Sequence, residues 1–192
     1  MWPWEHVAVA YLCFSGLARL RGRGPPSATL AVAVVAAALA PDVVDKPLAW
    51  VLAVLPGGRS LGHSLFTALG VVAVAAGIER RLDVRGLGAA VATGYLTHLA
   101  ADVGYPLVVK GELRAGFLLW PLVPAAPSSP VDAVDHVGEL FAAFLTFLAT
   151  PTGTAYLLAE LALLAAALAV WLADGAPGTR SLRSAVGRSE PE

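Results

Sequence analysis

The sequence predicts an all-α protein, a transmembrane bundle of several helices with a polar site at one membrane face. Of its 192 residues, 57% are hydrophobic and only 14% are charged, whereas soluble domains carry about a quarter charged residues. The apolar residues also fall into separate stretches of roughly 16–18 residues, close to the length of about 20 residues that spans a bilayer. This length and composition predict one membrane-embedded domain over residues 1–173, followed by a polar, disordered tail over residues 174–192.

Glycine and proline residues separate the first two apolar stretches. The first stretch covers Val7–Leu20 and ends at a break that includes Gly22, Gly24, Pro25 and Pro26. The second covers Ala28–Ala40, because Ser27 is a residue type favoured at helix N-caps and Pro41 interrupts the apolar run. We expect one helix from each stretch.

The middle of the chain contains a short apolar piece and two longer stretches. Pro47–Leu55 is short, Leu61–Ile78 forms the third long stretch, and the fourth runs from Gly86 to Val103. The fourth is expected to end at the run Gly104-Tyr105-Pro106, since the residue before a proline disfavours helical geometry.

The remaining chain is predicted to hold one further clear span. Residues 107–137 contain many prolines and several charges, so we expect a surface or re-entrant loop with a short amphipathic piece. Gly138–Thr150 is apolar but short, and Ala155–Leu172 is the last span.

Basic residues predict the orientation, because Lys and Arg gather on the cytoplasmic side of membrane proteins. Three arginine clusters follow the first span, the third span and the last span: Arg19, Arg21 and Arg23; Arg80, Arg81 and Arg85; Arg180, Arg183 and Arg188. The N-terminus is then extracytoplasmic and the C-terminal tail cytoplasmic. The first cluster follows the apolar run instead of preceding it, so we expect the first segment to be retained and not cleaved as a signal peptide.

This orientation places the histidines and several carboxylates at the outer face. They are His6, Asp42, Asp45, His63, His98, Asp102 and His136. His98 and Asp102 are spaced i, i+4, and Asp42 and Asp45 i, i+3, so each pair lies on one face of a helix. Imidazoles and carboxylates are ligands for divalent metals, so the grouping predicts a metal site.

Plainer interpretations exist for several of these residues. His6 can act as an interfacial anchor beside Trp2 and Trp4. Asp42 and Asp45, between two prolines, can cap a following turn. Asp132 and Asp135, with His136, lie in a region of Pro and Ser where solvated charges are usual, so they receive less weight. The single cysteine, Cys13, is read as a small buried hydrophobe. Because the chain has only this one cysteine, a zinc site built on several cysteines is excluded.

Four motifs resemble, in order, those of the YdjM-like family of small membrane proteins. They are PDVVDKP at 41–47, RSLGHS at 59–64, GYLTHLAAD at 94–102 and LLWPL at 118–122, and the likeness covers roughly residues 1–125. The family is classed among metal-dependent hydrolases and is distantly similar to zinc-dependent phospholipase C and P1-type nucleases, which are all-helical. The resemblance implies that His6, Asp42, His63, His98 and Asp102 hold the metal, with Asp45 as the second acid.

These observations predict a membrane-bound, metal-dependent hydrolase. Zinc fits the donors, with manganese as the alternative. Asp45 is the candidate general base or bridging ligand, and Arg59 the candidate contact for an anionic oxygen of a phospholipid or other phosphoester. The rival interpretation is a non-enzymatic membrane scaffold with a structural metal or polar network. The net charge of −1 gives no indication of nucleic-acid binding, and the sequence leaves the oligomeric state open.

Overall fold

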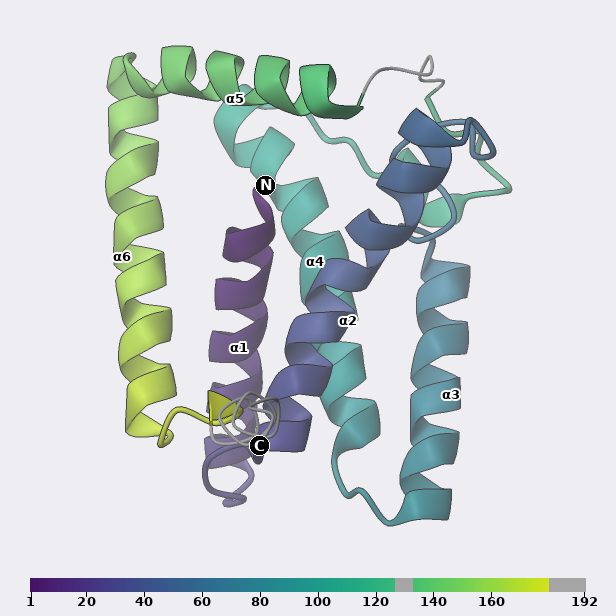
Figure 1. Cartoon of the computed structure of the whole chain (residues 1–192), viewed down its shortest axis with the longest axis vertical. Coiled ribbons are helices and arrows are strands. Elements are labelled where there is room, and N and C mark those ends of the chain that lie inside the picture. Colours follow the sequence, from purple (N-terminus) through teal and green to yellow (C-terminus); the bar gives the residue numbers. More distant parts are fainter. Residues whose placement is uncertain (127–132, 180–192) are drawn as a thin grey trace, which may run out of the picture.

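The computed structural model describes residues 1–126 and 133–179 and confirms the all-α fold, with no strand among these residues. The helices are α1 (Pro3–Leu20), α2 (Ala28–Lys46), α3 (Leu65–Leu82), α4 (Leu87–Lys110), α5 (Ala133–Leu148) and α6 (Pro151–Ala173). Figure 1 shows α1 to α4 as a bundle, α6 alongside α1, and α5 lying crosswise at one end. The two short elements are a π-helical turn (Pro47–Val51) after α2 and a 3-10 turn (Gly116–Leu119) after α4.

Two helices continue past prolines at which the sequence predicts breaks. Helix α2 runs through Pro41 to Lys46, and α4 runs through Pro106 to Lys110 instead of ending at Val103. A proline removes one helical hydrogen bond, but both prolines are buried in a packed bundle, where neighbouring groups compensate for that loss. The expected loop over residues 107–137 is therefore wrong at both ends, which belong to α4 and α5.

Helix α3 begins later than the sequence predicts. Its N-cap is Ser64, whose hydroxyl accepts a hydrogen bond from the amide of Phe66 at 3.1 Å. His63 consequently lies in the loop before the helix and not in its first turn. This loop carries the histidine towards α2.

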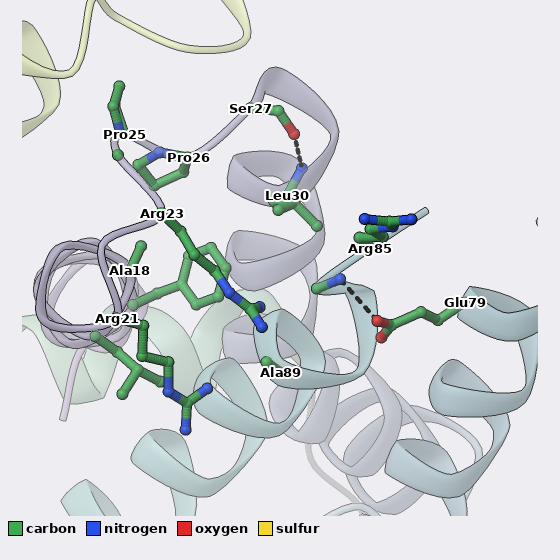
Figure 2. A pocket seen from close by; sticks show the side chains of 14 residues that line it. Ala18, Arg21, Arg23, Pro25, Pro26, Ser27, Leu30, Glu79, Arg85 and Ala89 are labelled. Atoms are coloured by element: carbon green, nitrogen blue, oxygen red, sulfur yellow. Dashed lines mark hydrogen bonds between the residues drawn. The ribbon is translucent and has the colours of Figure 1, made fainter. Parts of the chain in front are cut away.

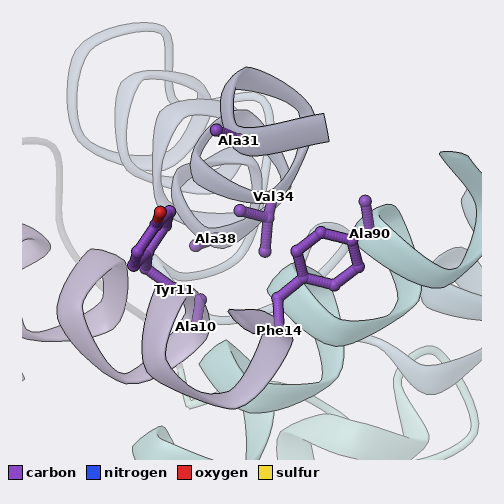
Figure 3. Packing of buried hydrophobic residues seen from close by; sticks show 7 residues of the cluster. All are labelled: Ala10, Tyr11, Phe14, Ala31, Val34, Ala38 and Ala90. Carbon is purple, nitrogen blue, oxygen red and sulfur yellow. The ribbon is translucent and has the colours of Figure 1, made fainter. Parts of the chain in front are cut away.

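The core between α1, α2 and α4 consists mostly of small side chains. Its buried residues are Ala10, Tyr11, Phe14, Ala31, Val34, Ala38 and Ala90 (Figure 3). Small residues let helix backbones approach closely. A Cβ atom at Gly94 would collide with the carbonyl oxygen of Val34 and lie 2.9 Å from the Cβ of Ala37. Glycine at this position therefore permits the close crossing of α2 and α4.

Two of the described helical segments are long and apolar enough to cross a membrane, Ala28–Val51 and Pro151–Ala173. Helix α6 is apolar nearly throughout and scarcely buried in the protein, with Leu158 64% and Leu172 58% exposed. Exposing this much apolar surface to water is unfavourable, whereas contact with the hydrocarbon chains of lipids is not. The other expected spans do not reach the same combination of length and hydropathy among the described residues.

The expected tail begins at Asp174, but this side chain is fully buried in the structure. Its carboxylate accepts hydrogen bonds from Tyr11 at 2.9 Å, from Ser15 at 2.7 Å and from Arg19 at 2.5 Å, all on α1. These bonds hold the end of α6 against α1. Residues 180–192 of the expected tail lie outside the described residues.

Candidate metal centre

Five of the sequence-predicted ligands meet near one end of the bundle. His6 comes from α1, Asp42 from α2, His63 from the loop before α3, and His98 and Asp102 from α4. All five are classed as buried, and the three histidines are at most 1% exposed. Two groups each bring potential ligand atoms within 4.8 Å of one another: His6, His98 and Asp102, and Asp42, His63 and His98. His98 belongs to both groups.

The rings of His63 and His98 are each oriented by a hydrogen bond at Nδ1. Nδ1 of His63 lies 2.8 Å from the Asp45 carboxylate, and Nδ1 of His98 lies 2.7 Å from the carbonyl oxygen of Ala38. Both partners are acceptors, so Nδ1 carries the proton on each ring. The two Nε2 atoms then face each other at 3.2 Å. Metal-ligating histidines are commonly oriented in this way, with the other ring nitrogen bonded to a carboxylate or carbonyl.

The imidazole of His6 is buried without a hydrogen bond. Among the described residues, its two ring nitrogens are the buried side-chain polar atoms that lack a partner. Nε2 of His6 lies 3.5 Å from Oδ1 of Asp102, and its ring stacks on that of His98 with centroids 3.8 Å apart. A buried polar group without a partner costs about 1–3 kcal/mol. A cation bound between His6, His98 and Asp102 would give one of the two nitrogens a partner, so the residues present fit a metal ion.

The two aspartates of the centre each face both a cation and an imidazole. Oδ2 of Asp42 accepts a hydrogen bond from Lys46 at 2.6 Å, while its Oδ1 lies 3.5 Å from Nε2 of His63. Oδ2 of Asp102 accepts from Nε of Arg59 at 2.7 Å and lies 3.4 Å from Nε2 of His63. A neighbouring cation favours the ionised form of a carboxylate, which is the form that binds a metal.

Asp45 is fully buried but is bonded differently from the other acids. Its carboxylate accepts hydrogen bonds from the amides of Ser60 at 2.6 Å, Gly62 at 2.6 Å and His63 at 3.3 Å, in addition to the His63 ring. A Cβ atom at Gly62 would lie 2.8 Å from the carbonyl oxygen of Pro41 and 3.2 Å from Oδ1 of Asp45, so glycine lets the loop close on α2. Asp45 thus holds the segment that presents His63.

The carboxylates also set the charge of His63. Burial lowers the pKa of its imidazole, but hydrogen bonds to Asp102, Asp42 and Asp45 outweigh burial and raise that pKa to about 10. A protonated His63 can donate from Nε2 to Nε2 of His98. A divalent cation at this position would compete with that proton, so metal binding would release it.

The structure does not bring His136 into this cluster. Its ring packs edge-on against Trp50 with centroids 4.9 Å apart, and its Nδ1 lies 3.8 Å from Glu139 on the same helix. Asp135 also lies on α5, and Asp132 falls outside the described residues.

A large cavity of about 1550 Å³ adjoins the centre, with Arg59 and the N-terminal Met1 in its wall. Its other charged lining side chains are all basic: Lys46, Lys110 and Arg114. The rest of the wall is rich in aromatic rings: Trp2, Trp4, Trp50, Tyr105, Phe117, Phe144, Phe147 and Tyr156. Sequence reasoning treated the tryptophans and Tyr105 only as interface or packing residues, because nothing in the linear pattern shows that they surround one space.

Sequence reasoning also did not identify two buried glutamates, Glu5 and Glu160, as residues with polar partners inside the protein. Glu5 accepts hydrogen bonds from the hydroxyl of Tyr156 and the amide of Trp2, and Glu160 accepts one from Nε1 of Trp4 at 2.5 Å. Glu160 lies well inside the last predicted span, so ionisable residues are not confined to the ends of the segments. A carboxylate within an apolar run was itself the signal, since such a group is costly in lipid unless it has a partner.

Comparison with known proteins shows one family. The family described as YdjM inner membrane protein matches residues 1–177, well beyond the motifs that suggest the likeness. Neither a curated protein nor a solved structure matches the chain. Because the match covers nearly the whole chain, this protein belongs to the YdjM inner membrane protein family.

Proposed function

We propose that this protein is a membrane-bound, metal-dependent hydrolase whose metal is held by His6, Asp42, His63, His98 and Asp102. The observation that carries this proposal is the buried, unpartnered imidazole of His6, which faces Asp102 and stacks on His98. Three imidazoles and two carboxylates form a donor set suited to zinc, and manganese is the alternative.

The proposed chemistry is hydrolysis of a phosphoester. A divalent ion in such a site activates water and polarises a phosphoryl oxygen. Arg59 supports this use, because only its Nε is bonded to Asp102 while the side chain is 40% exposed and lines the cavity. Its outer N–H groups can donate to an anionic oxygen.

In this proposal Asp45 positions His63 and does not act as the general base that the sequence suggests. Both of its oxygens accept hydrogen bonds from the loop of residues 60–63. A base must reach the proton that it removes, and these bonds direct the carboxylate towards the loop. Asp45 therefore acts through the orientation of His63.

The cavity supports an amphiphilic substrate at the membrane surface. Among the described residues, its charged side chains are four cations and a histidine, without a carboxylate, so it favours an anionic group. Its aromatic rings offer a surface for an apolar chain. A phospholipid or another phosphoester lipid has both parts.

We further propose that the N-terminus and the centre are extracytoplasmic and that the C-terminal tail is cytoplasmic. The arginine clusters after α1 and α3 lie at the end of the bundle opposite the centre, which supports this orientation. In a Cys13→Ala background, a cysteine placed at Pro3 should react with an impermeant thiol reagent on intact cells, and one placed at Ala185 should not. Labelling of position 185 alone would reverse the orientation.

The hydrolase proposal is tested with the purified protein in detergent. We expect release of phosphate or headgroup from at least one member of a panel of phospholipids and generic phosphodiesters. A chelator should abolish release, and added zinc or manganese should restore it. Activity that persists in chelator and in His98→Ala would place the chemistry elsewhere. Firmly bound metal with no turnover on any substrate would instead favour the scaffold.

A further inference from the structure

A second cavity lies at the end of the bundle opposite the candidate metal centre. It has a volume of about 580 Å³ and is enclosed by the end of α1, the connection to α2, the end of α3 and the start of α4 (Figure 2). Three arginines line it: Arg21, Arg23 and Arg85. They come from two connections far apart in the sequence, which the fold brings together.

Among the residues that the structure describes, no carboxylate of the cavity wall pairs directly with these arginines, although Arg23 and Glu79 attract each other. Glu79 is the acid in the wall, and its two oxygens accept hydrogen bonds from the amides of Gly86 and Gly88, each at 2.8 Å. Arg21 and Arg23 form no hydrogen bond or ion pair with any described side chain. Arg85 lies 3.5 Å from Asp83, but both side chains are more than 85% exposed, and such surface pairs are weak.

Two helices also begin at this cavity. Ser27, the N-cap of α2, and Gly86, the N-cap of α4, both line it. Helix N-termini carry partial positive charge, but at α4 the Glu79 carboxylate already accepts hydrogen bonds from the amides of Gly86 and Gly88. The start of α2 therefore adds to the field of the arginines, whereas the start of α4 is capped by an acid. The three arginines and the start of α2 make the cavity electropositive.

The rest of the wall is apolar. Phe14, Leu17 and Leu30 line it, together with Pro25 and Pro26. A ligand that fits both parts carries an anionic group beside a hydrocarbon portion. Guanidinium groups bind phosphate oxygens through paired N–H donors.

We propose that this cavity binds the phosphate of an anionic phospholipid in the leaflet opposite the candidate metal centre. Clusters of arginine at the end of a membrane helix recognise anionic headgroups, and here the adjacent apolar wall accommodates the first part of the acyl chains. The site is separate from the cluster of His6, His98 and Asp102, so it does not depend on the proposed hydrolase activity.

The test is lipid retention by the purified full-length protein in detergent, measured by native mass spectrometry. Phosphatidylglycerol, which carries a net negative charge, is compared with phosphatidylcholine of the same chains. We expect preferential retention of phosphatidylglycerol, and about 10- to 30-fold weaker binding in Arg21→Gln/Arg23→Gln. Inorganic phosphate in excess should not displace the lipid, because it lacks the apolar part.

The matched control is Arg80→Gln/Arg81→Gln, which removes the same charge at the same end of the bundle from arginines outside the cavity wall. It should retain phosphatidylglycerol as well as the unchanged protein does. If both double variants lost phosphatidylglycerol retention equally, the effect would be one of general surface charge, and the proposal would be overturned. Unchanged binding in Arg21→Gln/Arg23→Gln, equal retention of the two lipids, or displacement by inorganic phosphate would also overturn it. Thermal unfolding followed by circular dichroism is used to check that the variants remain folded.

Discussion

Replacing His98 and Asp102 together by alanine is expected to abolish metal binding. His98 belongs to both groups of potential ligands, and Asp102 belongs to the group with His6. Their loss leaves only one ligand of the first group and two of the second. Three or four protein ligands are the usual requirement of a zinc site. Neither group keeps three, and the three residues that remain from both groups lack His98, the ligand that the groups share.

Elemental analysis of the detergent-purified protein measures this effect. The matched control is His136→Ala/Glu139→Ala, which removes a histidine and a carboxylate paired at 3.8 Å on α5 but outside the centre. The control should carry as much metal as the unchanged protein. Equal metal in both double variants, or negligible metal in the unchanged protein, would contradict the assignment.

Asp45→Asn is expected to weaken metal binding by about 10- to 100-fold, in the range seen when a partner of a metal ligand is removed. The carboxylate accepts from three backbone amides and from the ring of His63. An asparagine offers one acceptor oxygen and places an NH₂ group against donors. His63 would then lose the partner that directs its Nε2 into the centre.

Metal titration of Asp45→Asn distinguishes the two roles considered for this residue. A positioning residue lowers metal affinity, and hydrolysis recovers when metal is added in excess. A general base would leave affinity unchanged and reduce the rate by about 10²-fold at saturating metal. Asp83→Asn, at an aspartate 86% exposed with a φ of 50°, is the control, since asparagine also tolerates that conformation. Asp83→Asn should change neither the metal affinity nor the rate of hydrolysis.

Local patterns in the sequence were enough to predict the helices and part of the centre. Apolar stretches separated by glycine and proline marked the helices, because hydrophobic length and backbone breakers act locally. The i, i+4 spacing of His98 and Asp102 placed both residues on one face of α4, since helix geometry alone determines that relation. The ends of α2 and α4 were wrong because burial against neighbouring helices outweighs the local effect of Pro41 and Pro106.

Other features depended on contacts that local patterns do not encode. The role of Asp45 was unclear from the sequence, because its partners Ser60, Gly62 and His63 are 15 to 18 residues away. The hydrogen-bond partner of Glu160, Trp4, lies 156 residues earlier in the chain. Hydrogen bonds over such separations exist only once the helices have packed.

The sequence by itself determined an apolar, all-helical chain with histidines and carboxylates near the ends of its segments, because composition and periodicity are properties of the linear chain. The tertiary structure alone decided that His6 stacks on His98 and that Ala38 orients that ring. The physical reason for the Ala38 contact is the close crossing of α2 and α4, which Gly94 permits by leaving no side chain between the two backbones. The stacking of His6 depends on the packing of α1 against α4. How closely helices approach depends on which surfaces meet, and only the packed bundle specifies that.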